Sequence, residues 1–458
     1  MSVAVPFRPA TGTAVPAVPG TAPTAVDTDR ARRAAVARRA ATRPFRGWLV
    51  AVVAANAVAV PVVLATAPGL AAASTVAAGV AGADVALAAL VRQQNVVNGL
   101  FRVATAAPLR WPLRVRAALA QVHQVGGGVH VGAALSAIGW FLAFTAMTAV
   151  AVLTGPASGW QVAILVVALA VLAVLLVMAV EARPSVREGH HDRFEHVHRW
   201  GGWSALVLLA GLTVLLGVAA GGPLLAALAA TPGAWILLVV TVAAVVPWLQ
   251  LRRVPVTITT PSDHVALVTL DRGHRVRAGS VTRIARRPLG QWHAFANMTR
   301  PETDAYRLAV SRVGDWTSRF IDERPDVVWV RGVPTTGVGT VGRLFHRVVW
   351  VATGSGIAPA LPHLVNDPTP AHLIWVTRNP ERTYGPALLD EIRTACPDTT
   401  VWDTDADGKP DLAALAARAV AETGAEAVVC ISNQHTTLRV VGELRERGIP
   451  AYGPIWDS

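Results

Sequence analysis

Six long apolar segments alternate with shorter polar ones through the first half of the chain. Each has close to the ~20 residues that a helix needs to cross a bilayer. The pattern predicts membrane-spanning helices over residues 47–67, 71–91, 127–153, 160–180, 202–221 and 233–250. Residues 1–46 are rich in alanine, proline and threonine and then become basic, which predicts a disordered cytoplasmic tail before the membrane domain of residues 47–251.

The period of the apolar positions changes beyond Arg253. Apolar and polar residues first alternate as in antiparallel strands, which predicts a small β-barrel over residues 252–343. From Val348 onward, short apolar runs alternate with helical patterns, which predicts a doubly wound α/β nucleotide-binding domain over residues 344–458. The expected strands are 254–260, 264–270, 306–312, 348–353, 372–377, 399–402 and 426–431. The expected helices are 357–366, 384–395, 411–422 and 435–447.

Positive charge is distributed unevenly among the connections between the apolar segments. The tail, residues 92–122, residues 181–200 and the pair Arg252–Arg253 are basic, whereas the other three connections have no lysine or arginine. Cytoplasmic loops of membrane proteins are enriched in these residues. We therefore expect a multi-pass protein of the cytoplasmic membrane with both termini in the cytoplasm. Topology and lipid headgroups account for the net charge of +12, so the expected partner is a bilayer and not a nucleic acid.

Composition agrees with a membrane protein that carries soluble domains. The hydrophobic fraction is 53% and the mean hydropathy is +0.44, values that exclude an ordinary soluble globular protein. The two cysteines, Cys396 and Cys430, stand far apart in the sequence. Neither a disulfide framework nor a cysteine-based metal site is therefore expected.

Histidines precede two of the predicted spans. His123 and His130 are seven residues apart, about 10.5 Å along one helical face, and His198 precedes the fifth span. Two interpretations stay open: these side chains bind a haem iron or another metal, or they lie at the membrane interface and bond to backbone or water. No histidine is expected near the far side of the membrane. Electrons that enter from the cytoplasm are therefore expected to stay on that side.

A glycine turn follows the strand expected at 348–353. Gly354, Ser355 and Gly356 lie between this strand and the helix expected at 357–366. Glycine lets the backbone approach a ligand closely, and a helix N-terminus offers free N–H groups to a pyrophosphate. Tight turns between strand and helix also contain glycine for steric reasons alone, so the turn by itself does not identify a nucleotide site.

Several motifs, taken in order, make the chain from about residue 254 onward resemble the ferredoxin-reductase-like FAD and NAD(P)H module of ferric reductases and NADPH oxidases. The motif Trp292-His-Ala-Phe-Ala296 resembles the flavin-binding His-Pro-Phe-Thr element of that family, and Gly314-Asp-Trp-Thr317 resembles its Gly-Asp-Trp-Thr element. Arg331-Gly332-Val-Pro stands where these proteins have a turn near the flavin phosphates. Gly354-Ser-Gly-Ile-Ala-Pro359 matches their nicotinamide-nucleotide loop.

The resemblance implies a set of binding residues. FAD would be bound by Trp292, His293, Phe295, Trp316, Thr317, Gly332 and Trp456. NADPH or NADH would be bound by Gly354, Ser355, Gly356 and Pro359, with Arg378 reaching a 2′-phosphate and so favouring NADPH. The catalytic candidate is Cys430, beside the nicotinamide. Packing alternatives stay open for two of these residues, since Cys430 can serve as a small apolar strand residue and Trp456 as a surface aromatic.

The membrane part is similar to that of the same group. A narrower likeness, carried by residues 190–203 and 453–458, is to large proteins that fuse an adenylation module to a membrane and reductase half. The resemblance covers about residues 45–458 and includes no adenylation module. Two features depart from the family pattern. The second histidine pair that would hold an outer haem is missing, so His123, His130 and His198 are candidates for one haem b only, and Ala296 replaces the hydroxyl residue that bonds the flavin.

The expected activity follows from these motifs. The chain is predicted to be a membrane-anchored, flavin-dependent NAD(P)H oxidoreductase that passes hydride from NAD(P)H to FAD. Electrons would then go to a single haem or to an unidentified acceptor on the cytoplasmic side. The alternative is a catalytically degenerate membrane protein that senses nucleotide or redox state, which Ala296 and the missing outer haem site favour.

Overall fold

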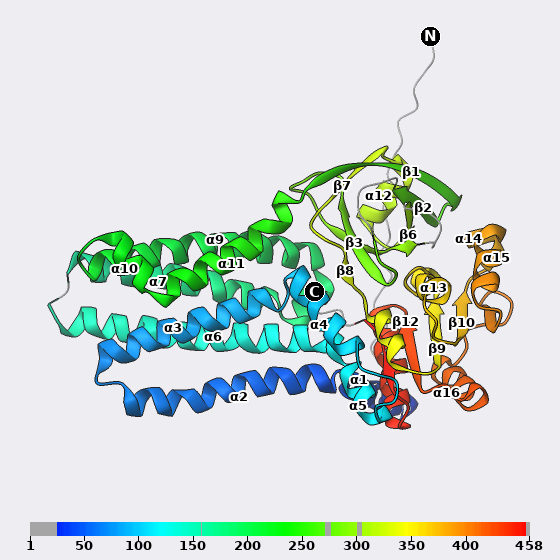
Figure 1. Cartoon of the computed structure of the whole chain (residues 1–458), viewed down its shortest axis with the longest axis horizontal. Helices are drawn as coiled ribbons and strands as arrows, with labels where there is room; N and C mark the ends of the chain where they lie inside the picture. Colours follow the sequence, from blue (N-terminus) through cyan, green and yellow to red (C-terminus); the bar gives the residue numbers. More distant parts are fainter. Residues whose placement is uncertain (1–24, 157, 271–275, 300–304, 455–458) are drawn as a thin grey trace, which may run out of the picture.

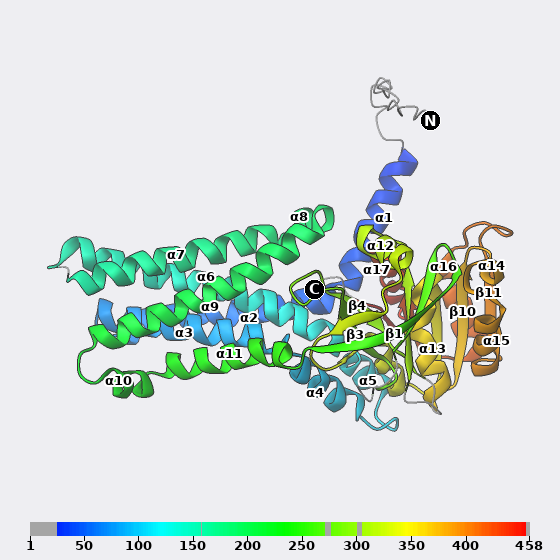
Figure 2. The same ribbon diagram turned by 90° about the horizontal axis from the view of Figure 1, so that it is seen from above.

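The computed structural model describes residues 25–156, 158–270, 276–299 and 305–454. Its long axis is a bundle of helices, and the two soluble domains lie together at one end of that bundle (Figures 1 and 2). Among these described residues, six helices are long and apolar enough to cross a membrane, as predicted. They are α2 (Arg43–Thr66), α3 (Leu70–Leu90), α6 (Val122–Thr154), α7 (Gly159–Glu181), α9 (His191–Ala219) and α11 (Pro232–Leu249).

Two of these helices begin well before the predicted spans. Helix α6 starts at Val122 and α9 at His191, because polar and basic residues continue the helix beyond the apolar stretch. With 33 residues, α6 is about 50 Å long, which exceeds the ~30 Å hydrocarbon thickness of a bilayer. The extra turns at its N-terminus reach the soluble domains, as Figure 1 shows.

Small residues let the membrane helices pack closely. Helix α6 packs against both α2 and α3, and α7 packs against α9. A Cβ atom on Gly132 would lie 2.9 Å from the carbonyl oxygen of Leu49, so only glycine permits this approach of α6 to α2. A polar group is buried in the same bundle: Asn56 donates to Asp84 at 3.3 Å and accepts from Trp140 at 2.8 Å. These bonds hold α2, α3 and α6 in register.

An antiparallel sheet of eight strands follows α11 and confirms the predicted barrel. The strand order is β4-β3-β7-β1-β2-β6-β5, with β8 paired to β3. The strands are β1 (Arg252–Ser262), β2 (Val265–Leu270), β3 (Ser280–Ala285), β4 (His293–Ala296), β5 (Met298–Thr299), β6 (Tyr306–Ser311), β7 (Val327–Val330) and β8 (Thr335–Thr336). Helix α12 (Asp315–Glu323) buries Phe320 and Ile321 in the barrel core. Strands β1, β2 and β6 were predicted from the sequence, whereas the shorter strands of the barrel were not.

The C-terminal domain is a parallel sheet of order β11-β10-β9-β12-β13, which confirms the doubly wound prediction. Its strands are β9 (Val348–Thr353), β10 (Ala371–Thr377), β11 (Thr399–Asp403), β12 (Ala427–Ile431) and β13 (Ala451–Tyr452). Helices α13 (Ile357–Asn366) and α15 (Pro386–Ala395) cover one face, and α16 (Leu412–Thr423) and α17 (Gln434–Glu446) cover the other. The helix expected at 384–395 is observed as α15 and begins at Pro386, because Gly385, with φ +81°, separates it from the additional short helix α14 (Pro380–Tyr384).

Part of the predicted N-terminal tail is ordered, which corrects the expectation of disorder for residues 25–41. They form helix α1 (Ala25–Ala41), which lies along α17 (Figure 2). A Cβ on Gly442 of α17 would overlap the carbonyl oxygen of Ala37, so the two helices touch through backbone. Arg445 of α17 donates to the Ala41 carbonyl at 2.9 Å. These tertiary contacts order a segment whose composition alone favours disorder. Residues 1–24 of the predicted tail lie outside the described residues.

Two further helices, both absent from the sequence prediction, join the membrane and soluble parts. Helix α4 (Gln94–Thr105) and α5 (Leu113–Leu119) lie in the basic connection between α3 and α6. Short helices α8 (Pro184–Gly189) and α10 (Leu224–Ala230) complete the connections of α9. One of the basic connections contacts the barrel directly: Arg199, in the first half of α9, donates to the Gly290 carbonyl at 2.9 Å.

Candidate functional site

The α/β sheet has a topological switch point, the place where ligands bind in proteins of this architecture. Strand β9 is central: its crossover through α13 leads to β10 on one side, and β12 pairs with it on the other. The direction of the crossovers changes between β9 and β12, so their carboxyl ends form the switch point of the sheet. Thr353 at the end of β9 and Ser432 just past β12 join their hydroxyl groups at 2.5 Å across this point.

The predicted glycine turn lies at that switch point. Gly354, Ser355 and Gly356 form one turn of 3-10 helix, η2, between β9 and α13. Gly354 has φ +51°, a conformation that favours glycine, and a Cβ on Gly356 would overlap the carbonyl oxygen of Ile431 in β12. Both glycines are therefore required by the backbone path. Ser355 is half-buried, and Pro359 lies in the first turn of α13.

Two aromatic side chains that the sequence analysis did not single out support the same turn. Trp375 of β10 donates from Nε1 to the Gly354 carbonyl at 2.9 Å. Tyr384 packs edge-on against Trp375, with ring centroids 5.1 Å apart, and its burial raises the pKa of the phenol to about 12. The phenol therefore stays protonated at neutral pH. These two rings support the turn on one side. The turn also faces the barrel, since residues of η2 lie against β6.

Arg378 lies just past the end of β10, where the resemblance places a contact to a 2′-phosphate. Its Nε atom pairs with an Asp405 carboxylate oxygen at 3.2 Å, and both side chains are exposed. An exposed pair of this kind is worth about 0–1 kcal/mol, so Asp405 does not prevent Arg378 from binding an anion. The carboxylate nevertheless lowers the net positive charge at this position.

Cys430 lies inside the domain core. Its side chain is fully buried with Val351, Val440 and Val441, on the α16 and α17 side of the sheet. Burial raises the pKa of the thiol to about 12, against a smaller opposing effect of the Thr437 side chain. The thiol is thus enclosed by the core on this side of the sheet, and its place beside a nicotinamide stays a prediction.

The flavin-like motifs of the barrel come together as a stack of rings. The His293 ring on β4 lies on Trp316 of α12, with centroids 4.1 Å apart. Trp316 also stacks on Phe295 at 6.1 Å and on Phe320 at 5.0 Å. Two motifs that are about 20 residues apart in sequence thus form one surface. Trp456, the predicted additional ring, lies outside the described residues.

Thr317 has a local structural role. Its hydroxyl accepts hydrogen bonds from the backbone N–H groups of Val313 and Gly314, at 3.1 Å each, and donates to the Gly314 carbonyl at 3.0 Å. These bonds close the first turn of α12 and leave the hydroxyl fully used. Trp316 and Thr317 therefore lie on the same helix, but the threonine hydroxyl caps that helix and has no hydrogen-bonding capacity left over.

The turn at Gly332 is covered by helix α4. Gly332 has φ +67°, and a Cβ there would overlap the side-chain oxygen of Gln94, which accepts from the Val333 N–H at 3.2 Å. Asn98, one helical turn later, donates to the Pro334 carbonyl at 2.9 Å and accepts from the Thr336 N–H at 2.8 Å. A membrane-proximal helix thus covers the surface that the resemblance assigns to the flavin phosphates.

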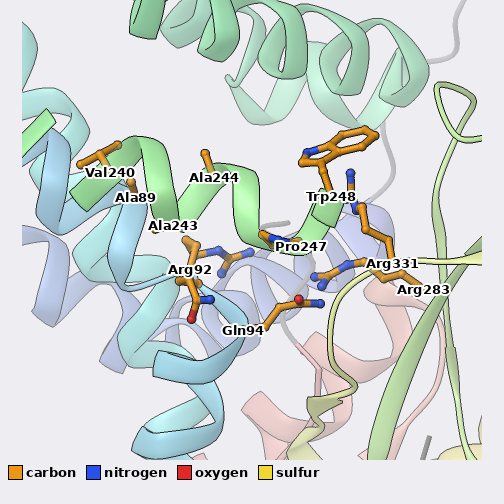
Figure 3. Close-up of a pocket in the computed structure, with 11 residues that line it drawn as sticks. Ala89, Arg92, Gln94, Val240, Ala243, Ala244, Pro247, Trp248, Arg283 and Arg331 are labelled. Atoms are coloured by element: carbon orange, nitrogen blue, oxygen red, sulfur yellow. The ribbon is translucent and has the colours of Figure 1, made fainter. Parts of the chain in front are cut away.

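Trp292 is buried and does not join the ring stack. Its Nε1 donates to the Pro288 carbonyl at 3.0 Å, and its ring lies edge-on to Trp248 at the end of α11, with centroids 6.4 Å apart. The guanidinium of Arg331 lies over both rings, 4.5 Å from the Trp248 centroid and 4.7 Å from the Trp292 centroid. Figure 3 shows Trp248 and Arg331 of this cluster. No sequence pattern predicts this cluster, because α11 and β7 are far apart in the chain.

The barrel residues fit a flavin in part. The Nε2 atom of His293 is buried and has no hydrogen-bond partner among the described residues. Burial is the largest effect on this imidazole and lowers its pKa, so it is neutral and offers one donor or acceptor. The faces of Phe295 and Trp316 suit an aromatic ring system. Ala296, by contrast, supplies no hydroxyl group.

The candidate metal histidines are separated into two environments. His130 of α6 and His198 of α9 have ring centroids 6.2 Å apart, and the His130 Nδ1 atom lies 2.8 Å from the Ala88 carbonyl. His123 instead packs edge-on against Tyr452 of β13, at 6.0 Å. The described residues contain no group of three or more His, Cys, Asp or Glu side chains that could hold a metal ion. This finding concerns metal ions held by several side chains; a haem iron needs only one or two axial ligands, so the haem stays a prediction.

Comparison with known proteins identifies homologues. Residues 338–458 match the family model described as "Adenylate-forming reductase 03009, C-terminal domain". Adenylate-forming reductase 06235 of Coprinopsis cinerea is 40% identical over 384 residues, and Adenylate-forming reductase 03009 of the same organism is 39% identical over 383 residues. Each alignment covers 83% of this chain and 37% of the relative, so the chain spans well under half the length of these proteins.

Solved structures similar to the soluble domains include two flavoproteins. One is a ferredoxin NADP+ reductase from Neisseria gonorrhoeae with bound FAD and NADP, at 16% identity and a TM-score of 0.36, covering 45% of this chain and 99% of that one. Another is the flavohem-like FAD/NAD-binding domain of nitric oxide dioxygenase from Vibrio cholerae, at 16% identity and a TM-score of 0.35, covering 44% and 99%. The sequence relationship is the stronger finding: this chain is homologous to part of the adenylate-forming reductases.

Proposed function

We propose that this chain is a membrane-anchored oxidoreductase that binds NAD(P)H at the Gly354–Gly356 turn and FAD at the ring stack of the barrel. The observation that carries the proposal is the position of the turn. It lies at the switch point of a parallel sheet and also lies against strand β6 of the barrel. A nucleotide bound there would extend toward the second domain. The names of the homologous reductases support the same class of reaction.

Most of the proposed nucleotide-binding groups are neutral, namely backbone N–H groups and hydroxyls. The free N–H groups at the start of α13 and the close backbone at Gly356 suit a pyrophosphate. The Thr353 and Ser432 hydroxyls, at the ends of the two central strands, would contact the ribose or nicotinamide end. Arg378 would bind a 2′-phosphate once it separates from Asp405. We therefore propose NADPH as the preferred nucleotide and NADH as the alternative.

The barrel residues orient the second group and exclude water. FAD held there would supply the hydride and single-electron chemistry of the reaction. The neutral Nε2 of His293 would hydrogen-bond to it, and the rings of Phe295 and Trp316 would pack against it. Because the hydride transfer needs only correct placement, the residues contribute mainly by orienting the two ring systems.

The anchoring part sets the side of the membrane on which the reaction occurs. All basic connections lie at the end of the bundle that carries the soluble domains. We propose that this end is cytoplasmic and that the membrane is the cell membrane. The electron acceptor would then be a molecule that reaches the same side, because the histidines lie at this end of the bundle too.

Substitution of the turn tests the proposal. Ser355→Glu places a carboxylate where a pyrophosphate would lie, and we expect the KM for NADPH to rise at least about tenfold, or ~1.4 kcal/mol. Thr394→Glu adds the same charge on the exposed face of α15 and should leave the KM unchanged. A KM equal to that of wild type in Ser355→Glu would contradict the nucleotide assignment.

A spectrum of the detergent-purified protein tests the flavin half. We expect a yellow flavin absorption that NADPH bleaches in wild type and bleaches slowly in Ser355→Glu. Colourless protein that FAD does not reconstitute would contradict the proposal. The same spectrum tests for haem: a b-type band would support the predicted haem, with His130 and His198 as candidate ligands.

A sensor without turnover is the second candidate. The cover that Gln94 forms over Gly332 and the use of Thr317 as a cap favour it, because both remove groups that the resemblance assigns to the flavin. This candidate predicts that NADPH binds, as measured by calorimetry, while no steady-state oxidation of NADPH occurs with any one-electron acceptor.

A further inference from the structure

Helix α1 runs across the long axis of the bundle, at the end where α2 begins (Figure 2). The six helices that are apolar enough to cross a membrane run along that axis. A helix that crosses membrane-spanning helices in this way lies along the bilayer surface. Ala41, the last residue of α1, stands only two positions before Arg43, where α2 begins, so this end of α1 lies at the membrane interface.

The direction of α1 is fixed by contacts from two other helices. Between α1 and α2 the backbone departs from helical geometry at Thr42, with φ −97° and ψ 5°. Gln124 of α6 is buried at this point; it donates to the Ala41 carbonyl at 3.0 Å and accepts from the Phe45 N–H at 3.2 Å. Arg445 of α17 donates to the same Ala41 carbonyl at 2.9 Å. Helix α1 is therefore held across the bundle from both sides of the bend.

One side of α1 packs against α17, and the opposite side is basic. Ala37 and Ala41 are buried on the α17 side. Arg32 and Arg39 are seven residues apart and share a face, roughly 140–180° around the helix from the two alanines. Both arginines are exposed. The contact with α17 thus turns these two guanidinium groups away from the α/β domain.

The positive charge of this stretch is not balanced by acidic residues. Residues 30–46 contain seven arginines, and no aspartate or glutamate occurs between Asp29 and Asp84. Four of these arginines are exposed and make no ion pair or side-chain hydrogen bond within the part of the chain that the structure describes, namely Arg32, Arg39, Arg43 and Arg46. They are therefore available to an anion outside the protein.

The start of α2 has the features of a bilayer interface. Trp48 is 46% exposed, and tryptophan is enriched at the level of the lipid headgroups. No described side chain of α2 is buried, so the helix beyond Trp48 presents its apolar residues to lipid. Arg43 and Arg46 precede Trp48 by five and two residues, which places them at headgroup level. Arg39 is four residues before Arg43, at most about 6 Å along a helix.

We propose that α1 lies on the bilayer surface and that its basic side, with the first turn of α2, binds the phosphate groups of acidic phospholipids. The guanidinium groups of Arg32, Arg39, Arg43 and Arg46 would donate hydrogen bonds to these phosphates, for which their planar geometry is suited. An anionic bilayer attracts basic residues over a Debye length of ~8 Å, and Arg39 lies within that distance of the start of α2.

The consequence concerns the position of the α/β domain. Because α1 also packs along α17, lipid bound to its basic side would hold that domain in one orientation to the membrane. Charge that served only to set the topology of α2 would not require a helix fixed along the membrane surface. The inference rests on the six helices crossing a bilayer and not on the proposed oxidoreductase activity.

The experiment measures hydrogen exchange of the full chain in nanodiscs of phosphatidylcholine, alone or mixed with phosphatidylglycerol. We expect phosphatidylglycerol to slow exchange of the backbone amides of residues 32–41 at least about fivefold, the order of effect expected for a basic residue at an anionic surface. High salt should abolish this difference, because it shortens the Debye length to ~3 Å at 1 M.

Matched variants separate this contact from a general effect of charge. Arg32→Gln with Arg39→Gln should remove the slowing by phosphatidylglycerol, whereas Arg32→Lys with Arg39→Lys should retain most of it. Both positions are exposed, so we expect each variant to keep the unfolding temperature of wild type in phosphatidylcholine. Arg319→Gln with Arg324→Gln removes the same charge from exposed positions beside the barrel and should leave the effect of phosphatidylglycerol unchanged.

Three outcomes would overturn the proposal. Equal exchange in the two kinds of nanodisc would mean that the arginines set topology only. Inorganic phosphate that slows exchange equally in phosphatidylcholine would make the ligand a free anion. Slowing that persists in the double glutamine variant would assign the lipid contact to other residues.

Discussion

The guanidinium of Arg116 forms two hydrogen bonds with the carboxylate of Glu426, at 2.8 and 3.1 Å, across 310 residues of sequence. Arg116 lies on α5, in the connection between the second and third membrane helices, and its side chain is 4% exposed. Glu426 directly precedes β12 of the α/β sheet. The pair therefore joins the α/β domain to the helical bundle through a buried guanidinium and a half-buried carboxylate.

Removal of this pair is expected to weaken the attachment. Arg116→Met leaves Glu426 with His346 alone and also removes the bonds from Arg116 to the Leu344 and Trp111 carbonyls. Because Glu426 is half-buried and keeps His346, the loss of the charged hydrogen bonds is expected to cost about 1–3 kcal/mol. We expect earlier thermal unfolding and faster proteolysis between the domains in detergent. Arg418→Met breaks the exposed pair with Glu422 and should cost less than about 0.5 kcal/mol; an equal loss in both variants would contradict the attachment.

The same contact should depend on pH. The Arg116 side chain lowers the pKa of Glu426 from its ordinary value of 4.5 to about 2. A carboxyl with a lowered pKa in the folded protein stabilises it above the ordinary value, and this contribution is lost as the pH falls through the folded value. Stability of the attachment is therefore expected to be constant above about pH 4.5 and to fall from there toward pH 2. Glu426→Gln should remove this part of the pH profile, and an unchanged profile would contradict it.

The cover that α4 forms over the Gly332 turn can be tested by hydrogen exchange. Asn98→Ala removes one donor and one acceptor that bind the Pro334 carbonyl and the Thr336 N–H. Leaving such groups without partners costs about 1–3 kcal/mol. We expect faster exchange of the backbone amides near Gly332. Asn95→Ala, on the exposed side of the same helix, should leave exchange at the turn as in wild type.

The two thiols should be inert in the folded protein. Both cysteines are buried, and burial raises the pKa of each, that of Cys430 to about 12. Thiolate is the nucleophilic form, so an alkylating reagent should label neither cysteine until the chain is unfolded. Cys430→Ala should lower stability by about 1 kcal/mol with little effect on NADPH oxidation. Rapid labelling of native Cys430, suppressed by NADPH, would instead support its predicted place beside the nicotinamide.

Local periodicity accounts for what the sequence predicted well. The six apolar spans, the alternation of strand and helix from Val348 onward and the position of the Gly354 turn each depend on residues that are neighbours in the chain. The helix expected at 357–366 is observed with those bounds. A hydrophobic pattern with a period of 3.6 or 2 identifies such elements because burial of one face is a local requirement.

The short barrel strands and the ordered part of the N-terminal tail were missed for the converse reason. Strands β3, β4 and β7 have four to six residues, and each is stabilised by partners that lie far away in sequence. Helix α1 is ordered by contact with α17, some four hundred residues later. No pattern within these segments records the partner that buries them.

The sequence by itself thus determined the membrane-spanning helices, the two classes of soluble domain and the loop that suits a nucleotide. Only the tertiary structure decided which of the candidate groups remain available: Thr317 caps a helix, Cys430 is buried, and Gly332 is covered by Gln94. It also set α1 across the bundle, with Arg32 and Arg39 on the side turned away from α17. These outcomes depend on contacts between residues up to several hundred positions apart, and the composition and spacing of a single segment carry no information about such contacts.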